Sequence, residues 1–294
     1  MTEPATPGEA IGALDAVPGP SVEEWLGAFR QAVEAQRRVF TEHEGVAARS
    51  EYDGIGEGGD RTLVIDRLCE DAIFDELETL HSAGHEFTAV SEERGSVSFA
   101  AADTDLRLVI DPIDGSLNAR RTIPCHSVSI AVADGPSMAD VRLGYVYEFG
   151  AGEEFVAVAG GGGGGASLAG RRLSVPEGNG LELVAMEASK PERVIAAAQV
   201  LDGRAYRIRC PGSIAVSLSY VAAGRFDGMF STRSCRSVDA AAAQLILREA
   251  GGRLSFGDAD LNEVPLDLEA RYDVAGARTP GDLAVLREAQ KAVG

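Results

Sequence analysis

The strongest chemical signal in the sequence is a run of acids beside a glycine turn, Asp111-Pro-Ile-Asp-Gly-Ser-Leu-Asn118. Its two aspartates follow an apolar segment typical of a buried strand. The backbone N–H groups of Gly115 and Ser116 could face an anion such as phosphate, because the segment that follows can begin a short helix. Acids beside an anion make sense only with divalent cations between them. The alternative is a surface turn, since Asp, Pro and Gly are common turn residues.

Three other acids could join this group. Glu92 lies in Ser91-Glu-Glu93, at the end of the preceding predicted strand, where its carboxylate could share cations with Asp111 and Asp114. Asp66 and Asp239 each stand where a helix is expected to begin. Carboxylate oxygens are the ligands that Mg²⁺ prefers, whereas a helix cap is the structural alternative for these last two acids.

The elements that must position these acids alternate along the chain. Ser21 and Glu24 form a capping-box pattern, which predicts a helix from about residue 22 to the low 40s. Residues 49–61 are predicted to form a loop and the run 160–165 a hairpin tip. Other predicted helices cover 66–82, 191–201, 213–223, 238–250 and 281–292, and predicted strands cover 87–90, 106–110, 126–133, 141–148, 153–158, 205–210, 226–230, 253–256 and 272–276. This alternation predicts a layered α/β fold.

Composition excludes several classes of protein. The chain has 294 residues, with 27 Lys and Arg against 46 Asp and Glu, so its formal charge is −19. A nucleic-acid backbone or an anionic membrane is a poor partner for such a chain. The four cysteines are too widely spaced for a zinc framework, which favours reduced thiols in a cytoplasmic protein. No apolar stretch is long enough to span a membrane, and residues 1–20 are interpreted as a flexible tail rather than a signal peptide.

Five segments taken together resemble the inositol monophosphatase / fructose-1,6-bisphosphatase superfamily of Mg²⁺-dependent, lithium-sensitive phosphatases, nearest to its bacterial and archaeal branch. They are DPIDGS (111–116), SEE (91–93), GDRTLVID (59–66), GSIA (212–215) and SVDAAAAQLILREAGG (237–252). The resemblance implies an αβαβα sandwich spanning 21–294. Within it, residues of about 21–180 would carry the metal motifs and residues of about 181–294 would close the site.

The resemblance also implies roles for individual residues. A first metal ion would be held by Glu92, Asp111 and the carbonyl of Ile113, and a second by Asp111, Asp114 and Asp239. A third, weaker ion would lie near Glu92 and Asp66. Asp66 and the hydroxyl of Ser116 would position and deprotonate the attacking water, so Asp66, Ser116 and Glu92 are the candidate catalytic residues. Substrate would be bound by Gly115, Ser116, Gly212, Ser213 and Arg236.

The implied activity is hydrolysis of a small sugar or polyol phosphate by metal-activated water. Inositol-1-phosphate and fructose-1,6-bisphosphate are the leading candidates, followed by histidinol phosphate, and relatives lead us to expect a homodimer. Ser116 replaces the usual Thr, and Val238 replaces a Trp that is common in inositol-preferring relatives. The alternatives are a non-catalytic metal- and phosphate-binding protein on the same scaffold, or a nucleotide-bisphosphate phosphatase. Arg120 and Arg121 could contact a second phosphate or could simply be solvated.

Overall fold

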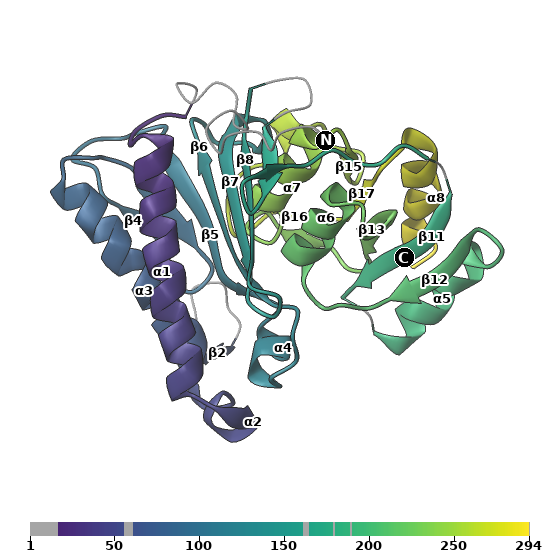
Figure 1. The fold of residues 1–294 in the computed structure, drawn as a ribbon, viewed down its shortest axis with the longest axis horizontal. Coiled ribbons are helices and arrows are strands. Elements are labelled where there is room, and N and C mark those ends of the chain that lie inside the picture. The colour runs from purple at the N-terminus through teal and green to yellow at the C-terminus, as the bar shows by residue number, and fades with distance from the viewer. Residues whose placement is uncertain (1–16, 56–60, 161–164, 179, 189, 294) are drawn as a thin grey trace, which may run out of the picture.

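The computed structural model describes residues 17–55, 61–160, 165–178, 180–188 and 190–293. In this part of the chain, helices and sheets alternate in layers, from α1 and α3 on one side to α5 and α8 on the other (Figure 1). The predicted αβαβα sandwich is confirmed. Each sheet therefore has both faces covered by helices, which buries the strand ends that carry the acids.

The larger sheet is built from residues 88–172. Its strand order is β10-β9-β8-β7-β6-β5-β3-β4, and only the β3–β5 pair in it is parallel. The strands are β3 (Thr88–Ser91), β4 (Gly95–Ser98), β5 (Arg107–Asp114), β6 (Ser127–Ala133), β7 (Val141–Glu148), β8 (Glu153–Val158), β9 (Ala166–Leu168) and β10 (Arg171–Arg172). The parallel pair places the ends of β3 and β5, with Glu92 and Asp111 after or within them, at the same edge.

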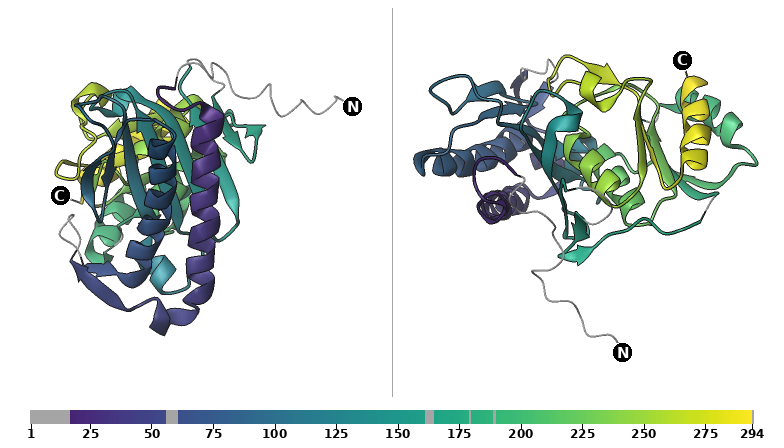
Figure 2. Two further views of the ribbon diagram at one scale, coloured as in Figure 1. Left: turned by 90° about the vertical axis from the view of Figure 1, so that its left-hand side faces the viewer. Right: turned by 90° about the horizontal axis from the view of Figure 1, so that it is seen from above.

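Helices α1 (Val22–Glu42) and α3 (Val64–Ser82) run side by side over one face of this sheet (Figure 2). The predicted capping box is confirmed, since the Ser21 hydroxyl accepts from the N–H of Glu24 while the Glu24 carboxylate accepts from the N–H of Ser21. Trp25 and Phe29 of α1 are fully buried and contact the rings of Phe87, just before β3, and Tyr145 of β7. Burial of each such side chain contributes about 1.5–3 kcal/mol, so aromatic packing holds this layer in place.

The middle layer contains α6 (Ile214–Ala222) and α7 (Ala241–Glu249), which pack between the two sheets. The alanines of α7 allow an unusually close approach to β7. A Cβ on Gly144 would lie only 2.5 Å from the carbonyl oxygen of Ala242. Small residues on both sides thus bring the beginning of α7, and Asp239 just before it, close to the larger sheet.

The smaller sheet has the order β12-β11-β13-β17-β15, with β12, β11 and β13 parallel. Its strands are β11 (Leu181–Glu187), β12 (Ala205–Arg209), β13 (Gly228–Ser231), β15 (Arg253–Phe256) and β17 (Val274–Ala277). Helices α5 (Pro191–Leu201) and α8 (Pro280–Lys291) cover its outer face. The remaining elements are short: α2 (Gly45–Ala48), β1 (Tyr52–Ile55), β2 (Arg61–Leu63), α4 (Ser116–Arg120), β14 (Cys235–Arg236), β16 (Arg271–Tyr272), and two 3₁₀ turns at Met138–Asp140 and Leu261–Glu263.

Several sequence predictions need correction. The predicted loop 49–61 contains two short strands, β1 and β2, which pair antiparallel, because Tyr52, Ile55 and Thr62 are of types that favour extended backbone. Strand β11 was not predicted, and neither were β4, β10 and β14, which are too short for periodicity to reveal. The strand predicted at 272–276 is divided between β16 and β17. The helix predicted from residue 238 begins at Ala241. Residues 237–240 form a turn instead, in which the N–H groups of Ala240 and Ala241 donate to the carbonyl of Ser237.

The predicted tail (1–20) and the predicted hairpin tip (160–165) lie largely outside the described residues, which do not include 1–16 and 161–164. Of the tail, Val17 is buried and the carbonyl of Pro18 accepts a hydrogen bond of 3.3 Å from the Trp25 indole. Among the described helices, none has the length and apolar character needed to cross a membrane.

Candidate active site

A β-bulge in β5 aims the two acids of the DPIDGS motif. Asp111 is paired with Ser129 of β6, and Asp114 is paired with Ser127, so three steps along β5 match two along β6. Residues three apart in a regular strand face opposite sides of the sheet. The extra residue restores a common side for both carboxylates, which is how bulges re-aim side chains beside functional sites. β5 thus continues through Asp114, four residues beyond the predicted strand.

Three acids from distant parts of the chain converge at this edge. One carboxylate oxygen each of Glu92, Asp111 and Asp239 lies within 4.8 Å of the other two. Each of these acids also has a local partner. Asp111 accepts from the N–H of Ile113 at 3.0 Å, Asp239 accepts from the N–H of Arg236 at 3.0 Å, and Glu92 forms an ion pair of 2.5 Å with the Arg236 guanidinium.

The acids are electrostatically costly without a cation. Burial, followed by the charges of Glu92, Asp114 and Asp239, raises the pKa of Asp111 well above its ordinary value. Burial and the charge of Asp114 raise the pKa of Asp239 to about 7. Oxygen ligands that repel one another in a buried site are the donor set that a hard divalent cation satisfies. The residues present therefore fit Mg²⁺.

Asp66 lies next to this cluster, in the first turn of α3. Its Oδ2 accepts from the N–H of Leu63 at 3.1 Å, which is the helix-cap role that the sequence left open. Its Oδ1 is buried and has no hydrogen-bond partner among the residues that the structure describes. Burial, together with the charges of Glu93 and Glu92, raises the pKa of Asp66 to about 7. One oxygen is thus structural, while the other is available to a ligand or a proton.

Asp114 has a different environment from the three clustered acids. Its Oδ2 accepts hydrogen bonds from the Ser213 hydroxyl at 2.5 Å and from the N–H of Ala215 at 2.7 Å. Its Oδ1 is 3.3 Å from the N–H of Ile214. The carboxylate therefore sits on the N-terminus of α6, where the helix dipole favours negative charge. Burial still raises the pKa of Asp114 to about 6.

The predicted anion-binding turn is formed by Gly115 and the short helix α4. Gly115 has a φ of +91°, and a Cβ there would lie 3.0 Å from the carbonyl oxygen of Gly212, so only glycine fits. The Ser116 hydroxyl donates to the carbonyl of Ile113 at 2.8 Å. The same carbonyl is the predicted backbone ligand, so the hydroxyl and the predicted metal position lie close together.

Besides Ser116 and Ser213, whose hydroxyls donate to Ile113 and Asp114, two more of the predicted substrate residues have structural partners. The N–H of Gly212 donates to Glu187 at 2.9 Å. Arg236 contacts Glu92 of the acidic cluster, and its side chain is 5% exposed. Arg236 is therefore placed to compensate charge at the cluster, and it is not among the described residues that line the neighbouring cavity. Arg120 donates a hydrogen bond of 3.0 Å to the Tyr52 hydroxyl.

A cavity of about 430 Å³ opens beside Asp114 and Gly212. Three cations line it, Lys190 and Arg193 near the start of α5, and Arg233 in the turn after β13. Sequence analysis missed these residues and also Glu187, which lines the same cavity at the end of β11. An Asn-Gly pair, typical of turns in sequences, and an apolar run mark β11 in the sequence, whereas nothing local connects the three cations.

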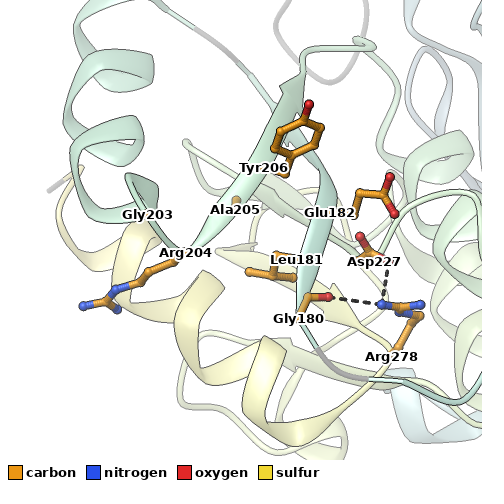
Figure 3. A pocket seen from close by; sticks show the side chains of 9 residues that line it. All are labelled: Gly180, Leu181, Glu182, Gly203, Arg204, Ala205, Tyr206, Asp227 and Arg278. Atoms are coloured by element: carbon orange, nitrogen blue, oxygen red, sulfur yellow. Dashed lines mark hydrogen bonds and ion pairs between the residues drawn. The ribbon is translucent and has the colours of Figure 1, made fainter.

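A second cavity, of about 560 Å³, lies at the opposite end of β11 (Figure 3). Arg278 there pairs with Asp227 at 2.6 Å and donates to the carbonyl of Gly180 at 3.1 Å, while Tyr206 projects outward. Its lining includes none of the predicted site residues. The cavity of about 430 Å³ at the C-terminal end of β11, together with the acids, is therefore the better candidate for an active site.

Comparisons with known proteins identify the family. The model of the inositol monophosphatase family matches residues 22–292. A fructose-1,6-bisphosphatase/inositol-1-monophosphatase of Methanothermobacter thermautotrophicus is 31% identical over 266 residues, covering 86% of this chain and 91% of that protein. The Nus factor SuhB of Escherichia coli is 33% identical over 198 residues, covering 65% and 70%. A solved inositol monophosphatase–fructose 1,6-bisphosphatase matches with a TM-score of 0.77 and 25% identity, covering 90% of this chain and 99% of that one. The chain belongs to the inositol monophosphatase family, and it is a phosphatase.

Proposed function

We propose that this phosphatase is Mg²⁺-dependent and hydrolyses a small sugar or polyol phosphate. The observation that carries the proposal is the convergence of Glu92, Asp111 and Asp239 beside Asp66, whose Oδ1 is buried without a partner in the described part of the chain. Glu92, Asp111, the carbonyl of Ile113, Asp114 and Asp239 would hold the ions. When bound there, Mg²⁺ would offset the charge of the phosphoryl oxygens and lower the pKa of a water molecule.

The protein's own residues would then position the reactants. Asp66 is suited to accept a proton from the attacking water, because a general base works best when its pKa is near the operating pH. The Ser116 hydroxyl, held near Ile113, would orient that water. The N–H groups of Gly115 and Ser116 would hold the phosphoryl oxygens, as preorganised donors do in phosphoryl transfer.

The cationic cavity favours a substrate with a second anionic group. Lys190, Arg193 and Arg233 surround the space that continues from Asp114, where the leaving group would extend. A second phosphate would compensate these cations, whereas inositol would bring only neutral hydroxyls there. We therefore rank fructose-1,6-bisphosphate ahead of inositol-1-phosphate, with histidinol phosphate less favoured. The name of the Methanothermobacter relative includes both of the first two activities.

Phosphate release from a substrate panel, with and without Mg²⁺, tests the proposal. The panel contains fructose-1,6-bisphosphate, inositol-1-phosphate, histidinol phosphate and a nucleotide bisphosphate. Release that needs Mg²⁺ and is fastest with fructose-1,6-bisphosphate is expected. Binding of metal and phosphate without phosphate release from any substrate would support a non-catalytic binding protein. Fastest release from the nucleotide bisphosphate would support a nucleotide-bisphosphate phosphatase.

We also propose a cytoplasmic homodimer. All four cysteines are unpaired thiols, as in a reducing compartment. The dimer rests on the family resemblance alone, and light scattering after gel filtration would measure it. The strongly negative chain offers no support for nucleic-acid binding.

A further inference from the structure

Glu187 is a buried carboxyl group for which the proposed reaction has no use. It ends β11 and is 1% exposed. Its Oε2 accepts from the N–H of Gly212 at 2.9 Å, and its Oε1 accepts from the Ser217 hydroxyl at 2.5 Å. The N–H of Ser213 also donates to this carboxyl group. Two of its three donors are thus consecutive backbone amides of one turn.

That turn is also held from the larger sheet's side. The Asn118 amide donates to the carbonyls of Pro211 at 2.6 Å and Cys125 at 2.8 Å. A Cβ on Gly212, whose φ is +93°, would lie 2.8 Å from the same amide nitrogen. The turn is therefore fixed between Asn118 on one side and Glu187 on the other.

The same turn positions Asp114. Ser213 is the N-cap of α6, and its hydroxyl accepts from the N–H of Val216 while donating to Asp114. The amides of Ile214 and Ala215 bind the same carboxylate. A continuous chain of hydrogen bonds thus runs from Glu187 through the turn to a proposed metal ligand.

We propose that Glu187 is a positioning residue of the metal site, acting on Asp114 through the Gly212–Ser213 turn. The inference rests on the proposed function, because it concerns the binding of the metal ion. Residues that orient metal ligands commonly change metal affinity about 10- to 100-fold when they are replaced. Glu187 would do so from the smaller sheet, so that the packing of the two sheets sets the geometry of one site.

Replacement of Glu187 by Leu removes both acceptor oxygens at similar volume, whereas Glu187→Gln keeps one oxygen for the turn. We expect Glu187→Leu to weaken Mn²⁺ binding about 10- to 100-fold, measured by electron paramagnetic resonance of free Mn²⁺ without substrate. Glu187→Gln should restore binding to near that of the unaltered protein. Equal weakening by both variants would overturn the inference, because the charge and not the hydrogen bonds would then matter.

Glu148 provides a matched control. It is also 1% exposed and accepts from two backbone amides, of Gly150 at 2.7 Å and Ala151 at 2.6 Å, but no hydrogen bond joins it to the acids. Glu148→Leu should lower the melting temperature of the metal-free protein and leave Mn²⁺ affinity unchanged. A loss of affinity equal to that of Glu187→Leu would show that destabilisation alone weakens the site, and would overturn the inference.

A double-mutant cycle tests the route through Ser213. If Glu187 acts through the turn, Glu187→Leu should add little to the effect of Ser213→Ala on Mn²⁺ affinity. Additive effects would overturn this route. Should Glu187→Leu fail to fold, Glu187→Asp replaces it, since one methylene less draws the carboxylate away from the turn and should also weaken binding. If the unaltered protein binds no Mn²⁺, the proposed function itself fails. If the unaltered protein binds Mn²⁺ and Glu187→Leu binds it equally well, only this inference fails.

Discussion

The hydroxyl of Ser213 donates a hydrogen bond of 2.5 Å to the carboxylate of Asp114, and this bond joins the two halves of the chain. Asp114 belongs to β5 of the larger sheet, and Ser213 caps a helix of the middle layer that leads into the smaller sheet. Both side chains are buried. The position of a proposed metal ligand in one half therefore depends on a helix end in the other.

Loss of this bond should destabilise the protein. Ser213→Ala removes a donor from a buried carboxylate and a helix cap together, which costs about 1–3 kcal/mol in the free energy of unfolding. Chemical denaturation of the metal-free protein measures it. Ser219→Ala, on the same helix, is the control, because no described residue is a hydrogen-bond partner of the buried Ser219 hydroxyl. Equal losses for the two variants would contradict a special role for the Ser213 bond.

Asp239→Asn should remove metal binding and activity together. The carboxylate lies within 4.8 Å of Glu92 and Asp111, and an amide in its place offers one neutral oxygen and no negative charge. We expect Mg²⁺-dependent phosphate release to fall at least about 100-fold, since changes outside the ligand set already cost up to that much. Asp105→Asn, an exposed acid before β5, should change neither quantity. Near-normal turnover of Asp239→Asn would contradict the proposed ligand set.

The site was predictable from sequence where its residues are neighbours in the chain. Asp111, Asp114 and Gly115 share one motif, and Glu92 follows a strand that pairs beside β5. The bulge that aims Asp111 and Asp114 was not predictable, because it depends on the register with β6. The same holds for the cavity, whose Lys190, Arg193 and Arg233 meet only when α5 and the turn after β13 pack together. The layered fold could be predicted because its periodicity is local, whereas strands of two or three residues have too few positions to show a pattern.

Asp66→Asn should separate chemistry from metal binding. The substitution keeps an oxygen near the N–H of Leu63 but removes the group that would take the proton. Turnover should fall about 10²- to 10⁴-fold, which is the usual contribution of a general base. Mn²⁺ affinity at the cluster of Glu92, Asp111 and Asp239 should change far less. Loss of Mn²⁺ binding as large as the loss of turnover would show that Asp66 is chiefly a ligand.

The acids also predict how pH affects stability. Burial raises the pKa of Asp66 and of Asp239 from 3.8 to about 7, so the folded protein binds more protons than the unfolded chain between these values. Stability contributed by these groups is present below their unfolded pKa and is lost as pH rises through about 7. The metal-free melting temperature should therefore fall between about pH 5 and pH 8, and Mg²⁺ should restore most of the loss at the higher pH.

The matched variant for this pH experiment is Asp239→Asn, which removes one of the two acids. Its metal-free melting temperature should depend less on pH than that of the unaltered protein, and Mg²⁺ should restore less. A melting temperature in EDTA that rises toward about pH 8 would contradict the raised pKa values of the acids.

The cationic cavity predicts that the binding of fructose-1,6-bisphosphate, measured by KM, depends on Arg233. Arg233 is exposed at the cavity lined also by Lys190 and Arg193. Arg233→Ala should raise KM for fructose-1,6-bisphosphate about 10-fold, because a charge-assisted hydrogen bond to phosphate contributes about 1.5–3 kcal/mol and the other two cations remain. The KM for inositol-1-phosphate should hardly change, and kcat should hardly change for either substrate. Arg207→Ala, an exposed arginine of β12 that lies outside this cavity, is the control and should leave both KM values unchanged. An equal rise in KM for the two substrates with Arg233→Ala would mean that the cavity does not bind the second phosphate.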